Sequence, residues 1–104
     1  MKITSESLQY LHNLRLEKKF IAEDFYPGAP DEDTRLRCQS LTDRLIDDLL
    51  LLLGAETSKE EILARARQTI DSFEDEDTEE REKVDDYLGE IMQAIEITDW
   101  TDHI

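Results

Sequence analysis

The chain has 104 residues with 27 acidic and 12 basic side chains, which gives a formal net charge of -15 at pH 7. This length supports one hydrophobic core, so we expect a single acidic domain over residues 1–104. Nucleic acids and anionic membrane surfaces are excluded as expected direct ligands, because both are bound through Lys and Arg clusters that this sequence lacks.

The first helical pattern begins after Thr4 or Ser5, either of which can cap a first turn. Its apolar stripe consists of Leu8, Leu11 and Leu14. A second apolar set is offset from this stripe: Leu16, Phe20, Ile21 and Phe25. The offset predicts a kink or short break within residues 13–18, with helix resuming toward Asp24. Pro27, Gly28 and Pro30 end the region.

The longest predicted helix covers residues 34–53, about 30 Å at 1.5 Å per residue. Asp31 or Asp33 can cap its start, and Gly54 is the expected stop. We expect these leucines to face the core: Leu36, Leu41, Leu45, Leu49 and Leu52. Because residues 49–53 are all leucine, neighbouring elements are expected to cover this end on several sides.

Two further helices are predicted from capping-box spacings, Ser58 with Glu61 and, more weakly, Asp77 with Glu80. Their inward stripes are Ile62, Ala66, Ile70 and Phe73 in the third helix, and Val84, Tyr87, Leu88, Ile91 and Ile95 in the fourth. The short connections favour an all-α fold, an up-and-down bundle of about four helices with a kinked first helix. Residues 97–104 show no clear pattern.

No catalytic or metal-binding motif is visible, so we expect neither an enzyme nor a cofactor. Cys38 lies near an apolar stripe, which favours a small buried side chain over a reactive thiol. His12 and His103 lie at opposite ends of the chain, without partners at zinc-ligand spacing. The acidic run lacks the glycine of a calcium loop, and no Glu-x-x-His pair is present for a di-iron site.

Compartment and membrane association follow from the same sequence. The single cysteine excludes an intramolecular disulfide, and residues 1–6 lack the apolar stretch of a signal peptide. Residues 49–53 are far too few to cross a membrane, which requires about 20 apolar residues. We therefore expect a cytoplasmic protein.

Nine acids crowd residues 74–86, more than helix capping requires. Two interpretations remain open, a merely solvated face and a binding surface for a cationic partner. The aromatic residues Phe20, Phe25, Phe73 and Tyr87 have core spacing, whereas Trp100 either tucks against the bundle or anchors an interface. The predicted partner-binding set is Asp75, Glu76, Asp77, Glu79, Glu80, Glu82, Asp85, Asp86, Tyr26 and Trp100.

Two motifs carry a resemblance to a known family. They are Phe25-Tyr26-Pro27-Gly28 after the first helical region, and Asp77-Thr78-Glu79-Glu80-Arg81-Glu82 at the start of the last helix, running into Tyr87-Leu88 and Ile91-Met92. From Phe20 to Ile97 the chain resembles small helical bacterial proteins described only as a domain of unknown function, which carry a Tyr-Pro-Gly turn and an Asp-Thr-Glu-x-Arg-Glu segment. It departs from them after Ile97, where a longer Gly- and Trp-containing segment is expected.

Some small acidic helical proteins of this kind resemble immunity proteins of contact-dependent growth inhibition systems, the antidotes of toxins delivered between bacteria. The resemblance implies a protein that neutralises a cognate basic toxin, and a nuclease is expected because its active cleft must hold phosphates. The alternative hypothesis is an acidic DNA mimic or regulatory adaptor that binds a housekeeping nucleic-acid-binding protein. Both hypotheses predict a basic protein partner and leave the oligomeric state open.

Overall fold

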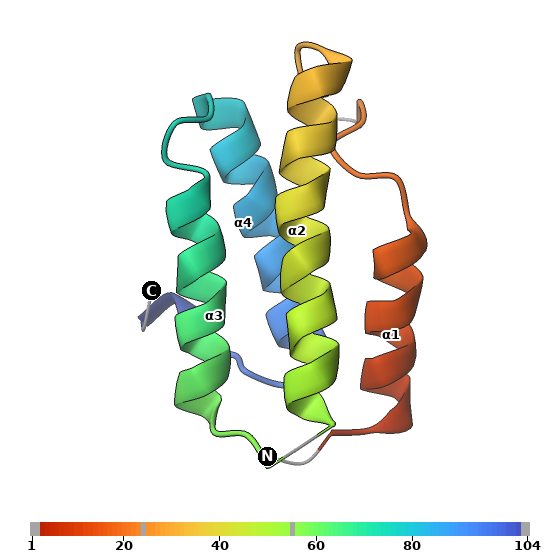
Figure 1. The fold of residues 1–104 in the computed structure, drawn as a ribbon, viewed down its shortest axis with the longest axis vertical. Coiled ribbons are helices and arrows are strands. Elements are labelled where there is room, and N and C mark those ends of the chain that lie inside the picture. The colour runs from red at the N-terminus through yellow and green to blue at the C-terminus, as the bar shows by residue number, and fades with distance from the viewer. Residues whose placement is uncertain (1–2, 24, 55, 103–104) are drawn as a thin grey trace.

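The computed structural model describes residues 3–23, 25–54 and 56–102. Their helices are α1 (Ser5–Leu16), α2 (Glu32–Leu53), α3 (Lys59–Ser72), α4 (Thr78–Ala94) and the short 3₁₀ helix η1 (Trp100–Asp102). The four α-helices stand side by side, and successive helices run in opposite directions (Figure 1). Helix α2 packs against α1 and α3, and α4 packs against the same two helices. The predicted all-α bundle is confirmed.

Local capping explains where three of the helices begin. The side chain of Thr4 accepts from the Ser7 amide at 3.0 Å, Asp31 accepts from the Thr34 amide at 2.7 Å, and Ser58 accepts from the Glu61 amide at 3.2 Å. These bonds satisfy amide groups that have no partner within the first turn of a helix. Asp77 precedes α4 without a side-chain capping bond.

The predicted break after the first helix is confirmed at Leu16, but the predicted return to helix toward residue 24 is wrong. Phe20 has φ of 61°, a left-handed conformation that a regular right-handed helix does not contain. Its amide donates to the Tyr87 hydroxyl of α4 at 3.1 Å, and the Lys19 amide donates to Gln39 of α2 at 3.0 Å. Contacts with two other helices therefore replace helical bonds in this segment.

An aromatic cluster forms one end of the core. The ring of Phe20 lies 5.8 Å from that of Phe73, 5.3 Å from Tyr87 and 6.4 Å from Tyr26, measured between centroids. The core positions predicted for Phe20, Phe73 and Tyr87 are confirmed. The prediction for Phe25 is wrong, because its side chain is fully exposed.

The leucine pattern of α2 is only partly confirmed. Leu45 and Leu49 are buried, whereas Leu36, in the first turns of α2, is 48% exposed. Leu51 is 76% exposed, so the end of α2 is covered on fewer sides than predicted. No helix in the described ranges is long and apolar enough to cross a membrane.

Candidate partner-binding surface

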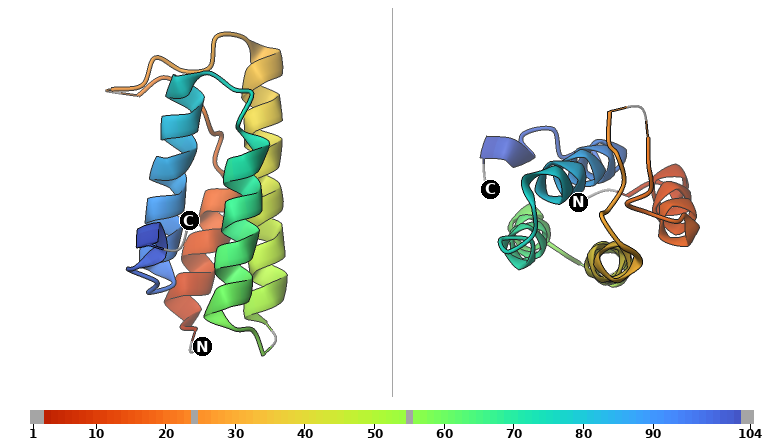
Figure 2. Two further views of the ribbon diagram at one scale, coloured as in Figure 1. Left: turned by 90° about the vertical axis from the view of Figure 1, so that its left-hand side faces the viewer. Right: turned by 90° about the horizontal axis from the view of Figure 1, so that it is seen from above.

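A four-residue turn at one end of the bundle presents Phe25 to solvent. Glu23 and Tyr26 form its base through two backbone hydrogen bonds, from the Glu23 amide to the Tyr26 carbonyl at 2.8 Å and in the reverse direction at 3.1 Å. The Phe25 side chain is exposed to the full extent of an unfolded chain. Figure 2 shows this segment projecting beyond the helices. A large aromatic side chain in this position has apolar area that only a partner can bury.

The turn is fixed to α4 by buried and half-buried contacts. The Tyr26 hydroxyl donates to Glu80 Oε2 at 2.8 Å, and Lys83 Nζ lies 2.6 Å from Glu23 Oε2. The same ammonium lies 5.6 Å from the Tyr26 ring centroid and 5.0 Å from that of Tyr87, close enough for cation–π attraction. Burial and the Glu80 carboxylate raise the pKa of Tyr26. The hydroxyl therefore remains a donor, and the turn is held in one position.

Gly28 allows the chain to return to the bundle after this turn. Its φ is 88°, and a Cβ atom there would lie 3.0 Å from the Ala22 backbone nitrogen. The Ala29 amide donates to the Phe20 carbonyl at 3.1 Å and closes the loop. Both the dihedral and the close approach require glycine.

Carboxylates border the exposed phenyl ring. Two adjoining hollows of about 550 and 220 Å³ flank the turn. Their charged lining residues are Glu23, Glu79, Glu82, Lys83 and Asp86, four acids and one base. The formal charge of this lining is therefore -3, and its one cation is already paired with Glu23. An exposed apolar side chain within a negative field is suited to a cationic, partly apolar surface.

The structure divides the predicted acidic set instead of keeping it as one patch. Glu80 is buried beneath Tyr26, and Glu76 is held by Arg37, whose Nε and Nη2 lie 2.6 and 2.8 Å from its carboxylate oxygens. The other seven acids of residues 74–86 are exposed, and none of them makes an ion pair with a described residue: Glu74, Asp75, Asp77, Glu79, Glu82, Asp85 and Asp86. The surplus negative charge is therefore present at the surface.

Position along the helix separates these seven acids. Glu79, Glu82 and Asp86 meet at the Phe25 turn. Asp85 borders a different hollow between α3 and α4, with Ile70 and Phe73, and Glu82 lines this hollow as well as the one beside the turn. Partial burial and the neighbouring Asp86 raise the pKa of Asp85. Asp75 and Asp77 lie in the connection before α4 and border neither hollow beside the turn.

Tyr26 and Trp100, the two aromatic residues of the predicted partner-binding set, are both packed against the bundle. Tyr26 is 7% exposed, so in this structure it supports the turn and presents little surface to a partner. Trp100 is half-buried against the core, near Gly89 of α4, as the tucked alternative predicts. It belongs to η1, toward the other end of the bundle from the turn (Figure 1). The spacing of Phe25 predicts a core position, whereas its place just before Tyr26 and Pro27 in a turn sequence is the signal that indicates exposure.

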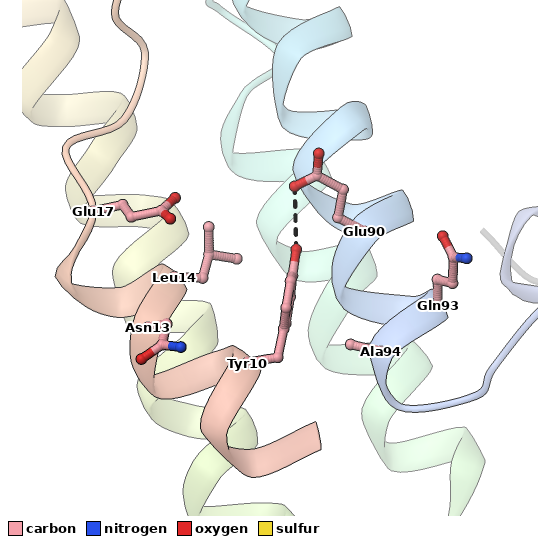
Figure 3. Close-up of a pocket in the computed structure, with 7 residues that line it drawn as sticks. All are labelled: Tyr10, Asn13, Leu14, Glu17, Glu90, Gln93 and Ala94. Atoms are coloured by element: carbon pink, nitrogen blue, oxygen red, sulfur yellow. Dashed lines mark hydrogen bonds between the residues drawn. The ribbon is translucent and has the colours of Figure 1, made fainter. Parts of the chain in front are cut away.

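Another hollow lies between α1 and α4 (Figure 3). It measures about 570 Å³ and is lined by Tyr10, Asn13, Leu14, Glu17, Glu90, Gln93 and Ala94. The Tyr10 hydroxyl donates to Glu90 Oε2 at 3.2 Å. Burial, followed by the charge of Glu90 and its hydrogen bond and then by Glu17, raises the pKa of Tyr10 to about 12.

Neither Cys38 nor His12 lines the hollows beside the turn or the hollow between α1 and α4. Cys38 is fully buried in α2, and burial raises the pKa of its thiol to about 12. His12 is exposed on α1, and His103 lies outside the described residues. Within the described ranges no three His, Cys, Asp or Glu side chains form a group that could hold a metal ion.

Comparison with known proteins gives one match. The model of a family described as "Domain of unknown function (DUF4844)" matches residues 2–103. No curated protein and no solved structure matches the chain significantly.

Proposed function

We propose that this chain, which belongs to that family of unknown function, is a binding protein whose partner is basic, an immunity protein that neutralises a cognate bacterial toxin. The observation that carries the proposal is the fully exposed Phe25 on a turn fixed to α4. Glu79, Glu82 and Asp86 of α4 line the hollow beside it.

Phe25 supplies the apolar anchor that a purely acidic surface lacks. Interfaces depend on a few buried anchors, often aromatic, whose truncation costs about 2 kcal/mol or more of binding free energy. The turn also lowers the entropic cost of association, because its backbone hydrogen bonds and the Tyr26 contact already hold it in place.

The acidic residues supply attraction and orientation. Unpaired carboxylates around an apolar anchor increase the association rate with a positively charged protein and disfavour acidic ones. A nuclease toxin fits this chemistry, because a cleft that holds phosphates presents Lys and Arg. Occupying such a cleft with carboxylates would block the substrate. The toxin class rests on the resemblance of the sequence and on this complementarity.

The test is growth rescue together with binding. The gene is co-expressed with the toxin candidate encoded beside it, and the dissociation constant of the purified pair is measured at two salt concentrations. We expect rescue, and a complex that weakens as salt rises. Absence of both rescue and binding contradicts the proposal. Displacement of DNA from several unrelated proteins would instead support the DNA-mimic hypothesis.

Matched variants locate the surface. Phe25→Ala should weaken binding about 30-fold or more, the equivalent of about 2 kcal/mol. The triple variant Glu79→Gln, Glu82→Gln, Asp86→Asn should mainly slow association. A control triple variant removes the same charge from exposed acids of α3, Glu60→Gln, Glu61→Gln and Asp71→Asn. If the control slows association equally, total charge and not this surface determines binding.

A further inference from the structure

The groove between α1 and α4 has the chemistry of a site for a cationic side chain. Ala94 supplies half-buried apolar surface beside the buried Leu14, Tyr10 supplies an aromatic ring, and Glu17 and Glu90 supply carboxylates. No lining residue is basic. Neither carboxylate makes an ion pair with a Lys or Arg among the residues that the structure describes.

The Tyr10 hydroxyl interacts with both acids of the groove. This hydroxyl donates to Oε2 of Glu90 at 3.2 Å, as Figure 3 shows, and so orients this carboxylate. The Oε1 atom of Glu90 accepts no hydrogen bond from any residue that the structure describes. Glu17 lines the same groove and acts electrostatically on the same hydroxyl, so both negative charges face this groove. A group with one positive charge and several donors would satisfy them together.

Arginine fits this arrangement better than a compact cation. Its guanidinium is planar, donates to carboxylates in a fork and stacks on aromatic rings. Its three-carbon stem covers apolar surface such as that of Ala94 and the Tyr10 ring. The groove is open at the surface, so a side chain carried by a macromolecule can enter without any rearrangement.

The groove also continues the surface around Phe25. Along α4, Glu79, Glu82 and Asp86 border the turn, and Glu90 and Gln93 border the groove. Steps of three or four residues keep all five on one face, which extends about 20 Å at 1.5 Å per residue. Seen from above, the segment around the turn projects past the side of the bundle where α1 and α4 meet (Figure 2).

We infer that the α1/α4 groove binds an arginine side chain of the same basic protein that contacts Phe25, and that this partner lies along α4. The inference rests on the proposed function for the source of the arginine. The site itself stands on the groove and its carboxylates, and it can be tested without the partner.

The test is a nuclear magnetic resonance titration of the full ¹⁵N-labelled chain with N-acetylarginine amide. The matched neutral probe is N-acetylcitrulline amide, which keeps the shape and removes the charge. We expect the arginine probe to shift the amide signals of Tyr10, Glu17, Glu90 and Gln93, and the citrulline probe to leave them unchanged. Shifts spread over all acidic surfaces, or equal shifts with both probes, would overturn the inference.

Variants complete the test. The double variant Glu17→Gln, Glu90→Gln should weaken binding of the arginine probe about tenfold, as expected for the loss of charge-assisted hydrogen bonds. The control Glu60→Gln, Glu61→Gln on α3 should leave it unchanged. Both pairs are exposed, and the amide spectrum of each variant verifies its fold. A double variant that binds the probe like the original chain excludes the groove.

Phe25→Ala separates the two proposals. It should leave the arginine titration unchanged while it weakens the complex with the toxin. If no toxin binds but the probe still occupies the groove, the proposed function fails and the arginine site stands. If the toxin binds, but the arginine probe does not shift the amide signals of the groove and the Glu17→Gln, Glu90→Gln variant does not weaken probe binding, the arginine site fails and the proposed function stands.

Discussion

The hydroxyl of Tyr26 donates to Oε2 of Glu80 at 2.8 Å, and both residues are buried, at 7% and 2% exposure. This bond joins the turn that presents Phe25 to the helix that carries the surrounding acids. Glu80 is therefore a buried member of the acidic run, and it positions the Phe25 turn beside the exposed acids of α4.

Tyr26→Phe should lower the free energy of unfolding by about 1–3 kcal/mol, because it leaves a buried carboxylate without its donor. Urea denaturation followed by circular dichroism measures the change. Tyr10→Phe is the matched control, since its hydroxyl donates to the exposed Glu90, and it should change the free energy of unfolding by less than about 0.5 kcal/mol. Equal losses in both variants would contradict the structural role of Tyr26.

A buried ion pair fixes the segment that follows α1. Lys19 is fully buried, and its Nζ atom lies 2.7 Å from Asp43 Oδ1 of α2 and donates to the Glu17 carbonyl at 2.9 Å. Lys19→Met should cost about 3 kcal/mol of the free energy of unfolding, because Asp43 keeps only the half-exposed Arg15 as a partner, at 3.2 Å.

The neighbouring Lys18→Met is the control, and it should change stability by less than about 0.5 kcal/mol because Lys18 is exposed. The double variant Lys19→Met, Asp43→Leu should recover part of the loss, since it leaves no buried charge unpaired. A single Lys19→Met variant as stable as the original chain would show that the pair does not fix this segment. Chemical denaturation of all three variants measures these differences.

The sequence predicts the four helices well, for reasons visible in particular residues. Thr4, Asp31 and Ser58 cap their helices as expected, and the stripe from Val84 to Ile95 is buried as its spacing predicts. These features depend on neighbours within a few residues. Local sequence patterns are therefore sufficient to predict the helix caps and the apolar stripe.

The segment of residues 17–31 depends on distant contacts and could not be predicted in this way. Lys19 pairs with α2 and Phe20 binds α4, and neither partner is identifiable from residues nearby in the chain. The division of the predicted acidic set has the same cause. The sequence predicts an acidic run, but it does not predict which of these acids stay exposed. Glu76 and Glu80 are held by partners in other parts of the chain, Arg37 and Tyr26.

The pair of Arg37 and Glu76 should make stability depend on pH. The hydrogen bond from the Arg37 guanidinium, with its charge, holds the pKa of Glu76 below its ordinary value of 4.5. A lowered pKa in the folded state stabilises the fold above the unfolded value, and the contribution disappears as pH falls through the folded value.

Arg37→Gln should therefore be less stable than the original chain at neutral pH, and the difference should shrink as the pH falls below about 4.5. Urea denaturation of both proteins between roughly pH 3 and pH 7 measures it. Arg44→Gln removes an exposed arginine from the same helix, one without an ion pair to the described residues, and should show no such dependence. A difference for Arg37→Gln that stays constant with pH would contradict the role of Glu76.

The thiol of Cys38 should resist alkylation in the folded protein. Burial, reinforced by Glu76, raises its pKa from 9.0 to about 12, so at pH 8 the fraction of reactive thiolate falls about a thousandfold relative to the unfolded chain. Iodoacetamide labelling followed by mass spectrometry, with and without denaturing urea, measures the ratio of rates. Because the folded side chain is also fully inaccessible, the rate should follow the opening of the bundle. Rapid stoichiometric labelling of the folded chain would instead support a reactive thiol and reopen the question of chemistry at this position.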